Sequence, residues 1–146
     1  MHKILVADDE KSVRMLMRNL LEKEEYEVIE AVDGKEAVEF ARRENPSVIL
    51  MDIKMPVMDG IEACRRLRKD EKTKYIPILA VTAVGQSKME AIAAGVDDFI
   101  HKPFDTEELS IRVRSMLKIR DLTDELQRVY AYVEELERQR KKSPKK

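Results

Sequence analysis

Five short runs of apolar residues alternate along the chain with stretches in which apolar residues recur every three or four positions. A short, unbroken apolar run is typical of a strand buried on both faces, whereas the wider spacing predicts one face of a helix. Buried strands joined by helices predict a parallel sheet with helices on both faces. We therefore expect a doubly wound α/β domain, with strands near residues 4–7, 28–29, 48–51, 78–81 and 99–100.

The helices between these strands carry recognisable end signals. Asp59 is suited to the N-cap of the third helix, and Gly95 to the residue that follows a short fourth helix. Asp105, with Glu108 three residues later, resembles a capping box that opens the last helix. The first helix has a single apolar face made of Val13, Leu16, Met17, Leu20 and Leu21.

The last helix is predicted to be longer than the domain that carries it. Neither Gly nor Pro occurs from Asp105 to Gln139, and at about 1.5 Å per residue such a helix spans roughly 50 Å. Its second half should therefore project from a domain formed by residues 1–118. We expect the basic residues 140–146 to be a disordered tail.

Residues 119–139 of this helix have an apolar pattern of their own. Six apolar residues recur at alternating steps of three and four, which puts them at the a and d positions of three heptads. The pattern predicts a parallel two-stranded coiled coil, and thus a homodimer. The alternative is an amphipathic helix that folds back onto its own domain. The six residues are Ile119, Leu126 and Val133 at a, and Leu122, Val129 and Leu136 at d.

Composition limits the cellular setting and the partners. Charged residues make up 39% of the chain, which a long solvated helix would explain, but the net charge of −1 predicts no particular partner. The single cysteine, Cys64, fits a reducing compartment. No apolar run approaches the roughly 20 residues of a membrane span. We expect a cytoplasmic protein that contacts no membrane and makes no direct contact with nucleic acid.

Polar residues stand where four of the predicted strands end. Because the carboxyl ends of parallel strands form one edge of a doubly wound sheet, we expect these side chains to converge. Three neighbouring carboxylates repel each other unless a cation neutralises them, and an all-oxygen set favours Mg²⁺. The residues are Asp8 and Asp9 after the first strand, Asp52 after the third, Thr82 at the end of the fourth and Lys102 after the fifth.

This set of residues suits the transfer of a phosphoryl group to a carboxylate. An aspartate can attack phosphorus and form an aspartyl phosphate, and Asp52 is the candidate nucleophile. Lys102 would supply a positive charge and Thr82 a hydrogen bond to the phosphoryl oxygens in the transition state. Each residue alone is more simply explained as a helix cap or a loop residue. Their joint occurrence at four strand ends favours the phosphoryl site.

Several segments resemble the response-regulator receiver domains of two-component signal transduction. Asp8-Asp9-Glu10 is similar to the acidic start of that family, and residues 52–60 resemble its phosphoacceptor loop. Thr82-Ala83 and Lys102-Pro103-Phe104 are similar to its two later signatures. The resemblance covers about residues 1–118 and implies a flavodoxin-like, chemotaxis-regulator-like fold with the strand order 2-1-3-4-5.

The resemblance also implies roles for individual residues. Asp52 would accept a phosphoryl group from a sensor histidine kinase or a phosphotransfer protein. Thr82 would then move toward the phosphoryl group and Phe99 would rotate inward, although Phe99 is as well explained as an aromatic of the core. The Lys102-Pro103 bond is often cis in the family. The implied Mg²⁺ ligands are Asp8, Asp9, Asp52 and the backbone carbonyl of Lys54.

Other functions are less consistent with the residues. A phosphohydrolase with an aspartyl nucleophile would need a second acid where this chain has Lys54. We therefore expect no turnover enzyme, only a switch that catalyses its own phosphorylation and slow dephosphorylation. A flavodoxin-like electron carrier would need a loop rich in Ser, Thr and Gly in place of Asp8-Asp9-Glu10. Two alternatives stay open: a dimerisation scaffold that works without phosphorylation, and a receiver fragment of a larger effector protein.

Overall fold

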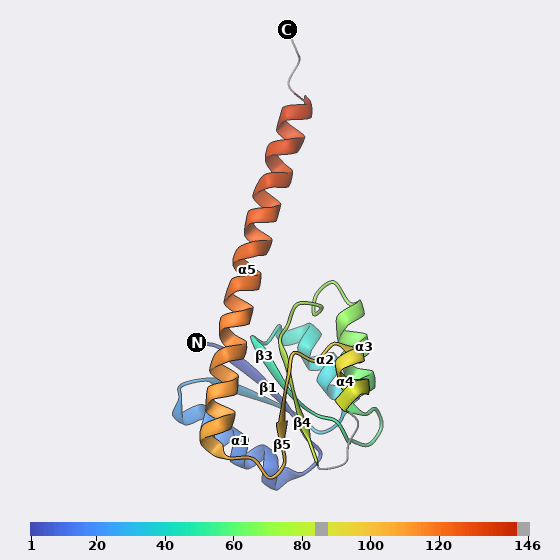
Figure 1. The fold of residues 1–146 in the computed structure, drawn as a ribbon, viewed down its shortest axis with the longest axis vertical. Coiled ribbons are helices and arrows are strands. Elements are labelled where there is room, and N and C mark those ends of the chain that lie inside the picture. Colours follow the sequence, from blue (N-terminus) through green and yellow to red (C-terminus); the bar gives the residue numbers. More distant parts are fainter. Residues whose placement is uncertain (84–87, 143–146) are drawn as a thin grey trace.

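The computed structural model describes residues 1–83 and 88–142, in which five strands alternate with five helices (Figure 1). All strand pairs are parallel, and the sheet has the order β2-β1-β3-β4-β5. The expected fold class and strand order are therefore confirmed. The strands are β1 (Lys3–Ala7), β2 (Glu27–Ala31), β3 (Val48–Asp52), β4 (Ile78–Thr82) and β5 (Asp98–His101). The helices are α1 (Lys11–Lys23), α2 (Gly34–Glu44), α3 (Gly60–Lys69), α4 (Lys88–Ala94) and α5 (Thr106–Lys142).

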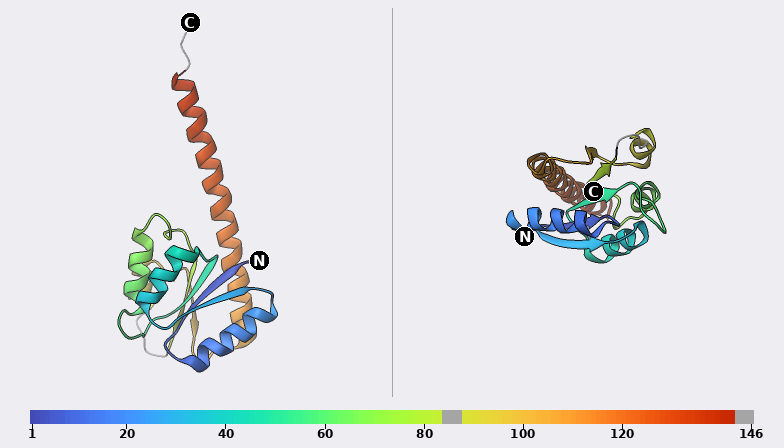
Figure 2. Two further views of the ribbon diagram at one scale, coloured as in Figure 1. Left: turned by 180° about the vertical axis from the view of Figure 1, so that it is seen from behind. Right: turned by 90° about the horizontal axis from the view of Figure 1, so that it is seen from below.

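Helices cover both faces of the sheet, which separates the core into two layers (Figure 2). On one face, α1 and the first part of α5 pack on strand residues that include Leu50 and Ile100. On the other face, α2, α3 and α4 pack on residues that include Ile49 and Ala80. Because successive strand residues point to opposite faces, every strand serves both layers. This is why the central strands read as unbroken apolar runs.

The helix ends show which local signals were informative. Asp59 caps α3, since its side chain accepts a hydrogen bond of 2.8 Å from the backbone N–H three residues later. Asp105 caps α5 through the backbone N–H of Glu107, also at 2.8 Å. Glu108 pairs instead with Arg112, at 3.7 Å. The expected partnership of Asp105 with Glu108 is therefore wrong, although the position of the cap is right.

The apolar face of α1 is wider than the surface on which the helix packs. Met17 and Leu21 are fully buried against the sheet, but Leu16 of the same predicted face is 47% exposed. Its neighbour Met15 is exposed as well. The helix buries only the side chains that point directly at the sheet, so the margin of its apolar face reaches solvent.

The 37 residues of α5 span roughly 55 Å, and the second half of the helix extends away from the domain (Figure 1). Apolar residues of the first part, among them Leu109 and Val113, are buried. The helix is unbroken through Lys142. Residues 140–142 are therefore helical, whereas we expected them to belong to a disordered tail. Residues 143–146 lie outside the described part of the chain. Among the described residues, no helix combines the length and the apolar character needed to cross a membrane.

Arg120 ties the base of the projecting half to the domain. Its guanidinium donates to the backbone carbonyl of Pro46 at 3.0 Å and to Oδ1 of Asn45 at 3.2 Å. It also pairs with Asp124 one turn further along the helix, at 3.1 Å. Asn45 adopts a left-handed conformation, with φ of 46°, and closes α2 at the turn that leads into β3. The projecting half thus starts at the edge of the sheet where the strands begin.

Candidate functional site

Three carboxylates and one ammonium group meet at the edge where the strands end. Oxygens of Asp8, Asp9 and Asp52 all lie within 4.8 Å of one another. Lys102 Nζ lies 2.9 Å from Asp8 Oδ2 and 3.2 Å from Asp52 Oδ2. Asp8 and Asp52 are buried and Asp9 is exposed, so the cluster opens to solvent on one side. The structure therefore brings together four of the residues that the sequence singled out.

Strand pairing explains why residues so far apart in the chain meet here. β1 pairs with β3, with Ala7 opposite Met51, so the following residues, Asp8 and Asp52, are neighbours. Lys102 follows β5, and its backbone N–H donates to the carbonyl of Thr82 at 2.7 Å. The peptide bond from Lys102 to the next residue, a proline, is cis. The site lies beyond the carboxyl ends of the strands, where doubly wound sheets commonly bind ligands.

The charged groups of the cluster shift each other's pKa values. Burial and the nearby Asp8 carboxylate raise the pKa of Asp52 to about 6, against the opposing effect of Lys102. Burial alone would lower the pKa of Lys102, but the carboxylates of Asp8 and Asp52 outweigh it and raise that pKa above its ordinary value. Asp52 is therefore ionised at neutral pH only at an electrostatic cost, which an added cation would reduce.

An arginine of α1 contacts the backbone of the loop that carries Asp8 and Asp9. Arg14 donates to the backbone carbonyl of Asp8 at 2.7 Å and to Glu30 Oε1 at 3.0 Å. Arg18 donates to the other oxygen of Glu30 at 2.7 Å. Burial would raise the pKa of Glu30, but these two arginines outweigh it and lower the pKa. Sequence reasoning missed Arg14 and Glu30, because nothing in the local pattern shows that they meet the acidic loop.

A glycine allows the loop after Asp52 to fold back against the site. A Cβ atom at Gly60 would lie 2.1 Å from the backbone oxygen of Asp52. The Gly60 N–H donates to the carbonyl of Ile53 at 2.8 Å and closes the loop. Any larger residue at position 60 would push the loop away from Asp52.

The residues of the cluster fit a hard divalent cation. Asp8 Oδ2 is buried, and the Lys102 ammonium lies 2.9 Å away as its ion-pair partner. The three carboxylates outnumber this ammonium group, so a metal ion would offset the negative charge that remains. Lys54 lines a shallow hollow together with Asp9, which is the open side of the cluster. Carboxylates next to open solvent suit Mg²⁺, which retains several of its waters.

Comparisons with known proteins agree with this arrangement. The family model for the response regulator receiver domain matches residues 4–114. The chain belongs to the response-regulator receiver family. It is thus the receiver domain of a two-component response regulator, as the motifs of the sequence indicated.

Two curated relatives show how much of a longer protein this receiver domain resembles. The transcriptional regulatory protein ResD of Bacillus subtilis is 42% identical over 118 residues, which cover 80% of this chain and 48% of ResD. The DNA-binding dual master transcriptional regulator RpaA of a Synechocystis strain is 41% identical over 123 residues, covering 83% of this chain and 51% of RpaA. The chain therefore spans about half the length of these relatives. Their names describe regulators of transcription, so our expectation of no contact with nucleic acid gains no support.

Solved structures share the fold. The chemotaxis response regulator CheY4 of Vibrio cholerae is 35% identical, with a TM-score of 0.75, and the match covers 80% of this chain and 99% of CheY4. The receiver domain of the sensor histidine kinase PA1611 from Pseudomonas aeruginosa is 31% identical, with a TM-score of 0.75, and covers 80% and 98%. In that neighbour a magnesium ion is coordinated in the active-site cleft.

In this receiver domain, two further predicted residues lie on β4 and β5. Thr82 is 1% exposed at the end of β4, and its Oγ1 lies 3.0 Å from Nδ1 of His101. Phe99 is partly buried and packs against the core layer beneath α2, α3 and α4. His101 was not among the residues predicted for the site. The register of β4 and β5, which pairs Thr82 with His101, is the feature that relates them.

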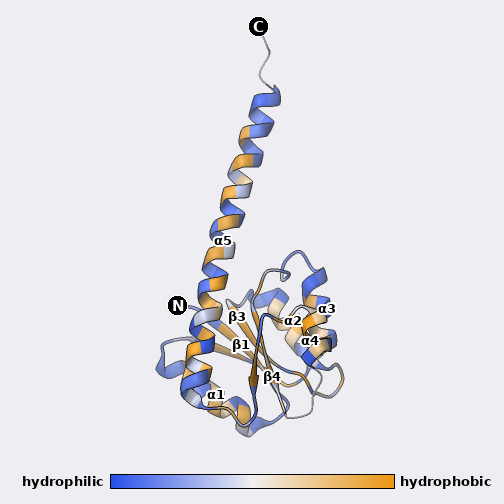
Figure 3. Ribbon diagram, in the orientation of Figure 1, coloured by the Kyte–Doolittle hydropathy of each residue, from blue (hydrophilic) through white to orange (hydrophobic). Residues whose placement is uncertain are grey.

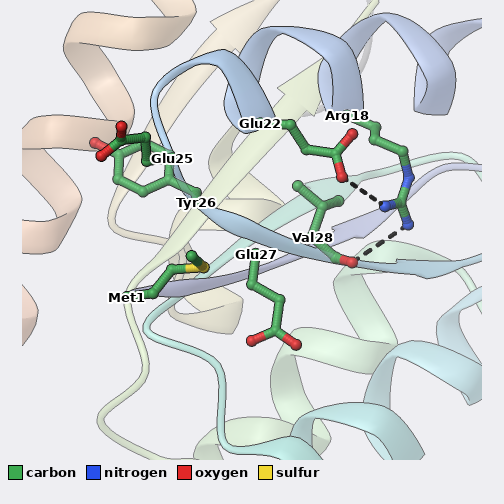
Figure 4. A pocket seen from close by; sticks show the side chains of 7 residues that line it. All are labelled: Met1, Arg18, Glu22, Glu25, Tyr26, Glu27 and Val28. Carbon is green, nitrogen blue, oxygen red and sulfur yellow. Dashed lines mark hydrogen bonds and ion pairs between the residues drawn. The ribbon is translucent and has the colours of Figure 1, made fainter.

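A separate hollow of about 690 Å³ adjoins the start of β2 and contains none of the residues predicted for chemistry (Figure 4). Its charged groups are already paired in part, because Arg18 donates to Glu22 and to the backbone carbonyl of Val28. We assign it no role. It is lined by Met1, Arg18, Glu22, Glu25, Tyr26, Glu27 and Val28.

Proposed function

We propose that this receiver domain accepts a phosphoryl group on Asp52 from a sensor histidine kinase or a phosphotransfer protein. The phosphorylated domain would then act as a conformational switch in a cytoplasmic phosphorelay. The observation that carries the proposal is the contact of Lys102 Nζ with both Asp8 and Asp52 inside a cluster of three carboxylates. This combination supplies a nucleophile, a fixed positive charge and oxygen ligands for a cation at one point.

The chemical step is a displacement at phosphorus. A carboxylate oxygen of Asp52 attacks the phosphorus of a phosphohistidine. The new P–O bond forms as the P–N bond breaks, and the electron pair leaves with the donor imidazole. With a pKa of about 6, Asp52 is mainly ionised at neutral pH and ready to attack. Lys102, 3.2 Å from Asp52, would bind a phosphoryl oxygen.

Mg²⁺ fits the same site. Asp8, Asp9, Asp52 and the backbone carbonyl of Lys54 are the proposed ligands. When bound, the ion supplies positive charge that offsets the repulsion of the carboxylates and the charge on the transferred phosphoryl group. The close approach of the three carboxylates, whose oxygens lie within 4.8 Å of one another, supports this assignment. A magnesium ion in the cleft of the Pseudomonas receiver domain is consistent with it.

A largely apolar surface adjoins the site next to Lys102. A groove of about 300 Å³ borders Lys102 between α1 and the start of α5. Leu16 is about half exposed there, next to the equally exposed Met15. We infer that the donor protein docks on this groove, which would bring its phosphohistidine to Asp52. The groove is lined by Glu10, Val13, Leu16, Lys102, Pro103 and Phe104.

The switch would involve Thr82 and Phe99. Thr82 lies at the end of β4 beside the site, so a phosphoryl group on Asp52 could attract its hydroxyl. Phe99 is only partly buried and could fill the space that Thr82 leaves. The expected output surface is therefore the one formed by β4, α4 and β5.

Intact mass spectrometry tests the phosphoryl transfer. The protein is incubated with acetyl phosphate and Mg²⁺, and we expect the wild type to gain one phosphoryl group and Asp52→Asn to gain none. Asp59→Asn is the matched control, because Asp59 is an exposed aspartate of the same loop. Equal uptake by wild type and Asp52→Asn would refute the assignment. No uptake by either would favour the alternative, a dimerisation scaffold that is not phosphorylated.

A second comparison isolates the docking groove. Leu16→Asp should slow phosphorylation by a phosphohistidine donor protein while leaving phosphorylation by acetyl phosphate unchanged, since the small donor needs no docking surface. Tyr75→Asp is the control, because Tyr75 is similarly exposed but precedes β4 at the opposite edge of the sheet. If Leu16→Asp affects both donors equally, the groove serves the site itself and not the donor protein.

We further propose that residues 119–139 form a parallel coiled coil with a second copy of the chain. The six apolar residues at a and d are between 39% and 66% exposed, although they repeat in register for three heptads. Apolar segments recur along this half of α5 between hydrophilic ones (Figure 3). A second helix would bury this stripe. β-branched residues at a with leucine at d favour two strands, and four of the six positions follow this preference.

The attachment of α5 supports a second copy as the partner. Arg120 and Asp124 take positions b and f, and Arg120 contacts the turn before β3. Position b lies about 130° around the helix from the middle of the seam. The seam therefore faces away from the domain that carries it. In a parallel pair, the two receiver domains would lie on the outside of the coil. Both acidic clusters would then lie at the edge of each domain that is remote from the coil.

Sedimentation equilibrium tests the dimer. Wild type should associate at tens of micromolar, and Leu126→Asp/Val129→Asp should be monomeric. The control Gln127→Asp/Ala131→Asp adds the same charge at positions b and f, outside the seam, and should still associate. A monomeric wild type, with or without phosphorylation, would show that the segment is a linker. Equal loss in both double variants would show that charge, and not the seam, governs association.

A further inference from the structure

We propose that His101 restrains the switch residue Thr82, and that phosphorylation of Asp52 transfers the Thr82 hydroxyl from the His101 imidazole to a phosphoryl oxygen. The inference rests on the proposed function, because it needs a phosphoryl group at Asp52. His101 is then a positioning residue, which acts on the site only through Thr82.

The geometry that carries this proposal is the last residue pair of two neighbouring strands. Thr82 and His101 are paired in register, so their side chains point to the same face of the sheet. Oγ1 of Thr82 lies 3.0 Å from Nδ1 of His101. Thr82 is almost fully buried while His101 is exposed. Burying a hydroxyl without a hydrogen-bond partner costs free energy. The bond to His101 should therefore persist until another partner for the Thr82 hydroxyl is available.

When the Thr82 hydroxyl is the donor to Nδ1 of His101, it cannot also donate to a second partner. A hydroxyl carries one proton and can donate it to one acceptor. While it donates to Nδ1 of His101, it cannot donate to a phosphoryl oxygen on Asp52. For the phosphoryl contact to form, the bond to His101 must break, or it must reverse with a proton on Nδ1. Either event changes the environment of Nδ1.

The exchange would carry the state of the site to the surface. His101 lies two residues after Phe99 on β5, so the two side chains share one face of the strand. Lys102, on the other side of His101 in the chain, contacts the acidic cluster. Release of the imidazole would therefore leave an exposed, unpaired histidine beside the second switch residue. The released imidazole would thus distinguish the phosphorylated from the unphosphorylated state on the output surface.

Nuclear magnetic resonance of the imidazole nitrogens tests the exchange directly, because the chain has only two histidines. His2 is the internal reference, since its Nδ1 lies 2.9 Å from Oγ of Ser47, far from the site in the chain. We expect Mg²⁺ with beryllofluoride, a phosphoryl mimic, to shift the His101 nitrogen signals and to leave those of His2 unchanged. In Thr82→Val, which lacks the hydroxyl, the His101 signals should no longer respond to the mimic.

The outcomes separate this inference from the proposed function. Fluorine resonance reports independently whether the mimic is bound. Bound mimic with unchanged His101 signals would overturn the exchange and leave Asp52 as the phosphoacceptor. Failure of the mimic to bind at all would contradict the proposed function, and the inference with it.

Affinity for the mimic gives a second test. One neutral hydrogen bond shifts an equilibrium roughly twofold to tenfold. We therefore expect His101→Ala to bind beryllofluoride with Mg²⁺ tighter by that factor, because Thr82 is then free. His101→Asn, whose amide can replace Nδ1, should restore the wild-type affinity, and His2→Ala should not change it. Wild-type affinity in His101→Ala, in a variant that melts like the wild type, would show that the contact does not restrain Thr82.

Discussion

The two halves of α5 belong to one helix but use their apolar residues in different ways. In the first half, side chains such as Leu109 and Val113 are buried against the sheet. From Ile119 onward, the apolar side chains repeat just as regularly but are largely exposed. Helical geometry is the same in both halves, and only the presence of a surface to pack on differs. An apolar period thus predicts that a face will be buried, but it does not say against what.

Ion pairs differ between the two regions in the same way. In the receiver domain, Arg14 is largely buried and connects Glu30 to the backbone of the acidic loop. On the projecting helix, Arg138 pairs with Glu135 one turn away, and both side chains are more than half exposed. Exposed pairs of this kind contribute little to stability. Charges organise a site in the first region and mainly solvate a helix in the second.

A matched pair of leucine-to-alanine substitutions should give the largest difference in stability between the two regions. Leu50 is fully buried, so Leu50→Ala should lower the free energy of unfolding by about 2–5 kcal/mol. Leu126 is half exposed, so Leu126→Ala should cost less than about 0.5 kcal/mol when the chain is monomeric. Urea unfolding at low protein concentration measures both. Equal losses would mean that the projecting half packs back onto its own domain, against the coiled coil.

The acidic cluster should give a smaller, pH-dependent difference in metal-free protein. The pKa of Asp52 is raised from 3.8 to about 6, so between these values the folded chain holds a proton that the unfolded chain has released. The free energy of unfolding should therefore fall as pH rises through this window. Thermal melts with a chelator should show this fall in wild type and in Glu134→Gln, a change on the projecting helix. Asp52→Asn should show less of it.

Added Mg²⁺ extends this test. At pH 7 the ion should raise the melting temperature of the wild type, because it binds only the folded state. Asp52→Asn should gain less. Identical pH dependence in wild type and Asp52→Asn, together with no effect of Mg²⁺, would contradict the metal site.

The two arginines compared above should differ in their effect on metal binding. Arg14→Ala removes the support of the Asp8 carbonyl and should weaken Mg²⁺ binding roughly tenfold, as loss of an outer-shell partner commonly does. Arg138→Ala should leave the affinity unchanged. Isothermal titration with Mg²⁺ measures both. Unchanged binding in Arg14→Ala would show that the strand pairing alone holds the acidic loop in place.

The joint between the regions should give the smallest effect. Arg120→Ala removes the contacts with the turn before β3, and we expect a loss of only about 0.5–1 kcal/mol in the free energy of unfolding. Amide exchange should increase near the start of the projecting half, while dimerisation persists because Arg120 is outside the seam. Arg128→Ala, on the projecting half, should change neither. Unchanged exchange in Arg120→Ala would mean that helix packing alone fixes the joint.

Local signals predicted local structure well. The apolar runs indicated all five strands, and Asp59 was recognised as a cap because the capping contact spans only three residues. The convergence of Asp8, Asp52 and Lys102 was also predictable, because parallel strands bring their carboxyl ends to one edge whatever their lengths. Leu16 shows the limit of such signals. Its spacing predicts the buried face of α1, but the amount of that face that the sheet covers depends on how the helix is set against it.

The sequence by itself determined the alternation of strands and helices, the residues that meet in the acidic cluster and the heptads of the last helix. Each of these depends on residues close together in the chain or on a general rule of the fold. Only the tertiary structure decided that Thr82 pairs with His101, that Arg14 supports Asp8, and that the pKa of Asp52 is raised. These features depend on strand register, on the setting of α1 and on the depth of burial. All three arise from contacts between segments far apart in the chain, which no local pattern records.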